Sequence, residues 1–201
     1  MRQILLLILS ILAISWFSGC SSYDTRLASR DTQYLMGSGI SSSTAPGQGY
    51  DGVSYWDGDG VSGPPSVQIH LEQQKAYFYK GDQLVGVSQV SSGREGYDTP
   101  AGNYKFIQKN KDHVSNLYGS YVDLSGNVLV RDISSRDPKP PGAIFRGAPM
   151  PYFMRIVGGV GMHAGFLPGY PASHGCIRMP EKMAEIFFSN ITVGTPVSIY
   201  K

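Results

Sequence analysis

The sequence contains few charged residues for its length. Charged side chains make up 16% of its 201 residues, and the formal net charge is only +2. Proteins that bind nucleic acids usually present a concentrated positive surface that neutralises phosphates. Because this chain has neither a strong positive balance nor a basic stripe, we do not expect nucleic acid to be its partner.

Cysteine is also scarce, with two residues, Cys20 and Cys176. Exported proteins usually pair their cysteines or do without them. A cysteine without a partner in an oxidising compartment is therefore expected to be used for its chemistry. If Cys20 carries a modification, Cys176 is left without a partner and is expected to act through its chemistry. The alternative is that Cys176 is a buried structural thiol.

Glycine and proline are abundant, with 25 and 13 residues. Apolar residues make up 41% of the chain and aromatic residues 11%, which is enough for a hydrophobic core. This composition is typical of a β-rich protein with many turns. The length allows one domain of ordinary size with extensions.

The amino terminus has the pattern of an export signal. Arg2 provides a positive charge, and residues 4–17 form an almost unbroken apolar run that is too short for a spanning helix. The stretch from Phe17 to Cys20 resembles the lipobox of bacterial lipoproteins, in which the cysteine receives lipid and becomes the first mature residue. An ordinary cleaved signal with an incidental cysteine is the alternative.

The lipobox resemblance implies that residues 1–19 are a lipoprotein-type signal peptide and that Cys20 is lipidated. The protein would then be exported to the periplasm and anchored to a membrane by this lipid. Ser21 follows the cysteine in place of an acidic residue. By analogy with lipoprotein sorting, this residue implies the outer membrane.

Residues 20–63 are rich in serine and glycine and show little hydrophobic periodicity. Such a segment buries too little apolar surface to fold alone. We expect a flexible tether with a reach of roughly 35–40 Å. Tyr50, Tyr55 and Trp56 are its residues best suited to pack on the following domain.

Residues 64–201 have the pattern of a mainly β domain. Val67, Ile69 and Leu71 alternate with polar residues and predict a half-buried strand. Further strands are expected at 76–79, 84–90, 104–108 and 195–200, with a hairpin across 121–130. The prolines of 138–151 predict a surface loop. One short helix is expected near the carboxyl terminus, from Pro180 to Asn190.

Cys176 lies close in sequence to two of the four histidines, His163 and His174. A neighbouring imidazole can take the thiol proton and form a thiolate–imidazolium pair, so we expect a thiol pKa well below about 8.5. Gly175 lets an acyl group approach the backbone and leaves amide N–H groups for an oxyanion. Arg178 adds positive charge near the thiolate or a substrate carboxylate.

Two motifs in this domain resemble those of a known family. His163, a spacer and the run Ser173-His174-Gly175-Cys176-Ile177-Arg178 are similar to the signature of L,D-transpeptidases with the YkuD-type catalytic domain. A second stretch at residues 91–102, which includes Thr99-Pro100-Ala101-Gly102, is similar to another motif of that family. The resemblance covers residues 64–201 and implies an L,D-transpeptidase-type β-sandwich that needs no metal or organic cofactor.

The resemblance also implies a reaction. Cys176 is the nucleophile that attacks the L,D amide of a peptidoglycan tetrapeptide stem, and His163 is the general base, oriented by the carbonyl of Ala164. An amine resolves the resulting thioester, so the implied partners are peptidoglycan stem peptides and the implied role is cell-wall crosslinking or remodelling. The spacing leaves open whether His163 or His174 takes the proton.

The remaining roles follow from the same resemblance. His174, Gly175 and Cys176 line the oxyanion hole. Arg178 holds the loop or a substrate carboxylate, and Ser173 forms hydrogen bonds within the site.

Three other functions remain as alternatives. With water as the acceptor the enzyme would be an L,D-carboxypeptidase. A cell-wall endopeptidase of the NlpC type usually has its cysteine before its histidine, whereas His163 precedes Cys176 here. A non-catalytic peptidoglycan-binding lipoprotein would have no reason to retain a reactive thiol.

A zinc site formed by His163, His174 and Cys176 is a further alternative. A closed zinc site needs a fourth ligand, and only His70, His113 or a distant carboxylate is available. We expect His70 to be a packed or surface residue and His113 to face solvent, so no metal site is expected.

Overall fold

The computed structural model describes residues 33–34 and 53–201. The expected signal peptide at residues 1–19, the expected lipidation site Cys20 and most of the tether lie outside the described residues. Among the residues that are described, no helix is long and apolar enough to span a membrane.

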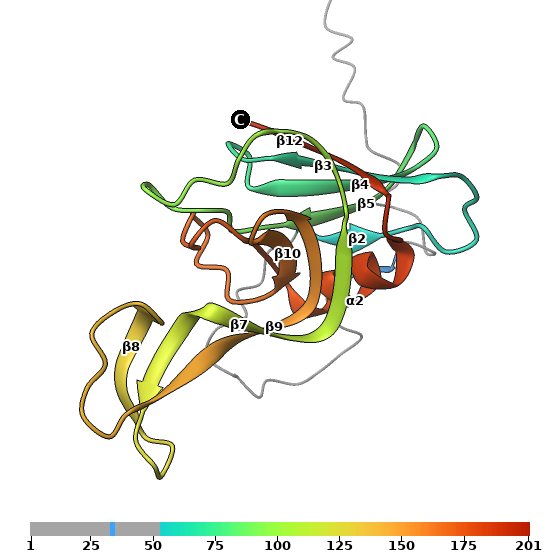
Figure 1. The fold of residues 1–201 in the computed structure, drawn as a ribbon. Coiled ribbons are helices and arrows are strands. Elements are labelled where there is room, and N and C mark those ends of the chain that lie inside the picture. Colours follow the sequence, from blue (N-terminus) through green and yellow to red (C-terminus); the bar gives the residue numbers. More distant parts are fainter. Residues whose placement is uncertain (1–32, 35–52) are drawn as a thin grey trace, which may run out of the picture. The chain divides into compact units, whose positions relative to one another are not determined.

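Two β-sheets and the helix α2 (Glu181–Asn190) form the described domain (Figure 1). The first sheet has the strand order β1-β2-β5-β4-β3-β12-β6, and the second has the order β11-β10-β9-β7-β8. The strands of the first sheet are β1 (Gln33–Tyr34), β2 (Tyr55–Trp56), β3 (Pro65–His70), β4 (Lys75–Lys80), β5 (Gln83–Gln89), β6 (Gly102–Lys105) and β12 (Pro196–Tyr200). Those of the second sheet are β7 (Gln108–Val122), β8 (Val128–Ser134), β9 (Ile144–Val157), β10 (Val160–Ala164) and β11 (Ile177–Met179). The mainly β fold with a short helix near the carboxyl terminus is confirmed.

Alternation along the strands of the first sheet produces its buried face. Val67 and Ile69 of β3 are buried, and the parallel neighbour β12 places Val197 and Ile199 beside them. The predicted strands at 76–79, 84–90 and 195–200 are confirmed. The single strand predicted at 104–108 is wrong, because the chain leaves the first sheet after Lys105 and enters the second at Gln108.

One hydrophobic core joins the two sheets and the helix. Phe78 of β4 packs edge-on against Phe187 of α2, with ring centroids 5.0 Å apart. The second sheet contributes Met154, Met162 and Ile177 to the same cluster. The second sheet therefore turns one face towards this core, and its other face remains for a site.

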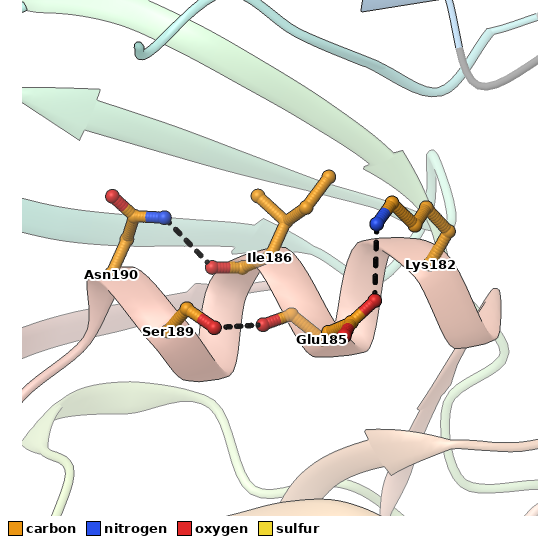
Figure 2. Close-up of polar contacts among 5 residues, drawn as sticks. All are labelled: Lys182, Glu185, Ile186, Ser189 and Asn190. Atoms are coloured by element: carbon orange, nitrogen blue, oxygen red, sulfur yellow. Dashed lines mark hydrogen bonds and ion pairs between the residues drawn. The ribbon is translucent and has the colours of Figure 1, made fainter. Parts of the chain in front are cut away.

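Figure 2 shows polar contacts along α2. Lys182 Nζ lies 3.1 Å from Glu185 Oε2, and Ser189 Oγ donates to the carbonyl of Glu185 at 2.8 Å. The Asn190 side chain donates to the carbonyl of Ile186 at 2.9 Å, where the helix ends. The Lys182–Glu185 pair is exposed and contributes little to stability. Helix formation therefore depends mainly on the buried face, formed by Met183, Ala184 and Phe187.

The surface loop predicted for residues 138–151 is confirmed only for 138–143 and is wrong for the rest, because β9 begins at Ile144. Pro149 and Pro151 pair with Val114 and Asp112 of β7, whereas β10 pairs with β9 only from Met154 onward. The two prolines are two residues apart, so their nitrogens point the same way. A proline, which cannot donate a hydrogen bond, is tolerated in a strand that has a neighbour on one side only.

The hairpin predicted across residues 121–130 is confirmed by β7 and β8. Asp123 closes the turn, since its carboxylate accepts hydrogen bonds from the N–H groups of Ser125 and Asn127 at 2.9 and 2.8 Å. The Asn127 side-chain amide, which donates to the carboxylate at 2.9 Å, lowers the pKa of Asp123 most, and the backbone N–H groups of Asn127 and Ser125 lower it further. A separate small cluster stabilises this end of the second sheet and contains Tyr121, Ile133, Ala143 and Phe145.

Residues 53–63, which the sequence analysis assigned to the tether, lie on the folded domain. Strand β2 pairs with β5, and Trp56 is only 3% exposed. Its ring packs edge-on against Phe78 at 5.2 Å, and its Nε1 donates to Asp59 at 2.9 Å. The folded unit therefore begins before Pro64.

We expect Trp56→Ala to lower the free energy of unfolding by about 3–5 kcal/mol, because it removes a large buried ring from the core. Denaturant unfolding of the purified protein measures this loss. Leu124→Ala is the matched control, since Leu124 is 86% exposed and its truncation should change the free energy by no more than about 0.5 kcal/mol. Equal effects of the two substitutions would contradict a core role for Trp56.

Candidate active site

Strands β10 and β11 bring the predicted site residues together. They pair in parallel, with Met162 beside Ile177 and His163 beside Arg178. Met162 and Ile177 point into the core, and alternation places His163 and Arg178 on the opposite face. Cys176 directly precedes β11, two residues before Arg178. Its side chain therefore belongs to the same face as that of His163.

Cys176 is a free thiol that is only 9% exposed. Its Sγ donates to the carbonyl of Gly159, in the turn between β9 and β10, at 3.5 Å. Among the hydrogen bonds of the described residues, none joins Cys176 to His163. The thiol therefore donates its hydrogen bond to the backbone, next to the strand that carries His163.

His163 is 5% exposed, and its Nδ1 lies 2.8 Å from the carbonyl oxygen of Ala164. A carbonyl can only accept, so Nδ1 carries the proton. The lone pair of the neutral ring is then on Nε2, which is free to accept a proton. This is the contact with Ala164 that the family resemblance implied.

Burial lowers the pKa of His163 to about 4. The hydrogen bond to Ala164 opposes this shift, whereas the positive charges of Arg178 and His113 add to it. His163 is therefore neutral at pH 7 and has the protonation state of a base.

Burial also raises the pKa of the Cys176 thiol. The N–H of Gly161 and the charges of Arg155 and Arg178 oppose this shift without cancelling it. The expected thiolate–imidazolium pair with a low thiol pKa is therefore wrong for the resting protein. Burial disfavours both charged forms, so the thiol and the imidazole are each neutral at rest.

Hydrogen bonds hold the turn before the nucleophile in shape. Ser173 Oγ donates to the carbonyl of Cys176 and accepts from the N–H of Gly175 at 3.0 Å. Gly175 has a φ of +105°, a conformation that favours glycine. Thr99 Oγ1 donates to the carbonyl of Gly175 at 2.8 Å and accepts from the N–H of Gly93 at 2.9 Å. The two motifs found in the sequence therefore meet at this turn.

Backbone pairing extends the contact between the two motifs. Ser91 and Arg178 exchange two backbone hydrogen bonds of 2.9 Å. The carbonyl of Ser92 accepts from the N–H of Ser173 at 3.0 Å, and the N–H of Arg94 donates to the carbonyl of Ser173 at 3.0 Å. Residues 91–94 thus pair through their backbone with residues of the segment that carries Cys176, and this pairing positions that segment.

The backbone donors at this turn are not equivalent. The sequence analysis expected the Gly175 N–H to be free for an oxyanion. It instead donates a hydrogen bond to Ser173 Oγ. No hydrogen bond of the described residues uses the Cys176 N–H. That amide is therefore the available donor for a developing negative charge.

His174 has a different environment from His163. Its Nε2 lies 2.7 Å from Nη2 of Arg94, and a guanidinium can only donate, so Nε2 accepts and the ring is neutral. The ring stacks on Tyr118 at 4.3 Å and contacts the edge of Tyr97 at 4.7 Å. Burial lowers the pKa of His174, and the charge of Arg94 lowers it further. Its basic lone pair is thus already in use.

The sequence analysis did not find Arg94, Tyr97 or Tyr118. Arg94 and Tyr97 lie within the second motif at residues 91–102, so the motif contained a signal for them. Tyr118 lies on β7, and no sequence pattern connects it with His174.

The two other histidines lie in different surroundings. His70 contacts Tyr77 and Tyr200 in the first sheet, as expected for a packed residue. His113 was expected to face solvent, but its ring stacks on Phe153 at 4.3 Å. The expectation was wrong because β7 pairs with β9 and thereby places a buried aromatic ring against His113.

Within residues 53–201, no group of three or more His, Cys, Asp or Glu side chains is arranged to hold a metal ion. The zinc alternative required His163, His174 and Cys176 as ligands. His174 instead accepts a hydrogen bond from the cation of Arg94.

The domain thus consists of two β-sheets, and the second sheet brings a buried free thiol and a buried histidine to one face. A family model described as the YkuD L,D-transpeptidase catalytic domain matches residues 64–199. The chain therefore belongs to the family of L,D-transpeptidase catalytic domains.

Solved structures share this fold. An L,D-transpeptidase from Stackebrandtia nassauensis is 16% identical with a TM-score of 0.51, over 70% of this chain and 57% of that chain. One from Mycobacterium smegmatis is 16% identical with a TM-score of 0.51, over 69% and 59%. The Enterococcus faecium L,D-transpeptidase C442S mutant is 24% identical with a TM-score of 0.51, over 69% and 50%. The predicted L,D-transpeptidase-type fold is confirmed.

This chain spans less than two thirds of the length of each of these three structures. The comparison with curated proteins gave no match.

Proposed function

We propose that this protein is a cysteine acyltransferase that crosslinks or remodels peptidoglycan by L,D-transpeptidation. The supporting observation is the arrangement of a buried free thiol at Cys176 and a neutral His163, with Nε2 unprotonated, on one face of β10 and β11. A solved structure that is 25% identical, with a TM-score of 0.51 over 68% of this chain and 49% of that chain, is described as an avibactam carbamoyl enzyme. That description supports a nucleophile able to carry an acyl-type group.

The proposed acylation begins from neutral groups. Cys176 Sγ forms a bond to the carbonyl carbon of the L,D amide while His163 Nε2 takes the thiol proton. The developing oxyanion accepts a hydrogen bond from the Cys176 N–H. His163 then returns the proton to the leaving amine, the C–N bond breaks, and the terminal D-residue departs from a thioester on Cys176.

Deacylation follows the same path in reverse with a different amine. The acceptor amine attacks the thioester carbon, His163 takes a proton from the attacking nitrogen, and that proton returns to the Cys176 sulfur as the C–S bond breaks. Burial of Cys176 limits the access of water, which favours aminolysis over hydrolysis. His174 has its lone pair engaged by Arg94, so we assign it to the wall of the site and the base to His163.

Incubation of the purified mature protein with tetrapeptide muropeptides tests this function. We expect crosslinked dimers by mass spectrometry, together with an acyl-enzyme whose added mass is a stem without its terminal D-residue. Tripeptide stems alone would instead indicate an L,D-carboxypeptidase. Binding to peptidoglycan without any new product would favour a non-catalytic lipoprotein and contradict the proposal.

We further propose that the protein is exported and anchored to the outer membrane through lipid on Cys20. The support is the apolar run at residues 4–17 followed by the lipobox-like stretch that ends at Cys20. At least two acyl chains are needed for a stable anchor. Intact-mass measurement is expected to show a chain beginning at Cys20 with added acyl mass, and cleavage without added mass would contradict lipidation.

A further inference from the structure

Three arginines lie near the nucleophile, and one carboxylate, Asp132, acts on one of them, Arg178. Arg94 contacts His174, and the charges of Arg155 and Arg178 act on Cys176. No carboxylate of the described residues forms an ion pair with any of the three. Three guanidinium groups outnumber the single carboxylate of Asp132, so their combined positive charge favours an anionic ligand.

Arg155 has a defined place in this group. Arg155 lies on β9 and pairs with Gly161 of β10. The next residue of β10, Met162, pairs with Ile177, so Gly161 lies beside Cys176, the residue before Ile177. Arg155 of β9, Gly161 of β10 and Cys176, which directly precedes β11, therefore occupy one row on the same face of the sheet. No side chain extends from the middle position of this row.

The Arg155 guanidinium is held by neutral groups only. Its Nε donates to Gln108 Oε1 at 2.7 Å, and its Nη1 donates to the carbonyl of Gly158 at 2.7 Å. The guanidinium also lies 5.0 Å from the ring centroid of Phe153. Gly158 precedes Gly159, whose carbonyl accepts the Cys176 thiol. One turn thus holds both the guanidinium and the nucleophile.

This arrangement leaves donors for a ligand. A guanidinium has five N–H donors, and the two hydrogen bonds use two of them. The side chain is only half-buried, so solvent-borne groups have access to it. A planar guanidinium whose orientation is already set is suited to bind a carboxylate through two parallel hydrogen bonds.

We propose that Arg155 binds a carboxylate of the acyl donor and thereby makes the enzyme select donors in which that carboxylate is free rather than amidated. The inference rests on the proposed transpeptidase function. A donor stem ends in the carboxylate of its terminal residue, and a stem with an acidic side chain carries a second one. Both have the chemistry that Arg155 recognises, and the experiment distinguishes between them.

The test compares three donors in the full mature protein: a tetrapeptide stem with free carboxylates, one amidated at the terminus and one amidated at the side chain. Acylation of Cys176 is followed by mass in a single turnover without acceptor amine, so that the effect belongs to the donor. In the wild type, one of the two amidations should slow acylation about 10–100-fold, as expected for losing a charge-assisted hydrogen bond. Arg155→Gln should slow the fully free donor by a similar factor and remove that discrimination.

Two controls accompany this variant. Arg146→Gln changes an exposed arginine of the same strand and should behave as the wild type. Arg155→Lys keeps the charge without the planar fork and should retain part of the discrimination; it also serves as the second variant if the glutamine substitution disturbs folding.

An equal fall of the Arg155→Gln rate on all three donors, or unchanged discrimination, would overturn the proposal. Either result leaves acylation of the wild type intact, so it would not count against the proposed function. Failure of the wild type to acylate on any donor would overturn the proposed function and this inference together.

Discussion

Cys176→Ala is expected to lower crosslinking and acyl-enzyme formation by at least about a thousandfold, because it removes the nucleophile. The fold should survive, since the change deletes one sulfur atom that interacts only weakly with the backbone, donating to the carbonyl of Gly159 at 3.5 Å. Rates on muropeptides and thermal unfolding of the same preparation measure the two effects separately.

Cys20→Ala is the matched control, because it replaces the other cysteine of the chain. It should leave turnover in solution unchanged. Cys176→Ser should not restore activity, since a hydroxyl is a much weaker nucleophile than a thiol at neutral pH. Wild-type turnover in Cys176→Ala would show that the nucleophile is misassigned.

His163→Ala is expected to lower the rate of acylation by about 10²–10⁴-fold, the usual contribution of a general base. His174→Ala should cost less, because the lone pair of His174 already accepts a hydrogen bond from Arg94. Single-turnover acylation of both variants gives the ranking. The reverse order would exchange the roles of the two histidines and leave Cys176 as the nucleophile.

The pH dependence provides a second test of the same base. His163 must be neutral to accept a proton, and its pKa is lowered to about 4. Activity should therefore persist below pH 6.5 and fall only as the pH drops through about 4. Iodoacetamide labelling of Cys176 should have a midpoint above the ordinary thiol range, because burial raises its pKa. An acid limb near pH 6.5 would indicate an exposed base instead.

Local sequence patterns predicted much of the fold and the location of the candidate site. The alternation of Val67 and Ile69 marked β3, and the apolar spacing after Pro180 marked α2, because both patterns express the period of one element. The order of His163 and the segment 173–178 indicated the site and the family, since these residues act at short range on one thiol. The roles of His163 as base and Cys176 as nucleophile remain predictions.

Contacts between distant segments decided the rest. Pro149 and Pro151 can lie in a strand because β7 is the only strand that pairs with β9 at these positions. The number of prolines in a segment does not reveal whether one side of it is unpaired. Arg94 lies 80 positions from His174 in the chain, yet it fixes the protonation of that ring.

The sequence by itself determined which residues are the candidates for the chemistry, because a thiol, an imidazole and their spacing are local properties. Only the tertiary structure decided their charge states. Burial of Cys176 and His163 disfavours both charged forms more than the nearby arginines favour the thiolate, and burial depends on the packing of the whole second sheet. The row from Arg155 through Gly161 to Cys176 likewise exists only because β9, β10 and β11 are neighbours.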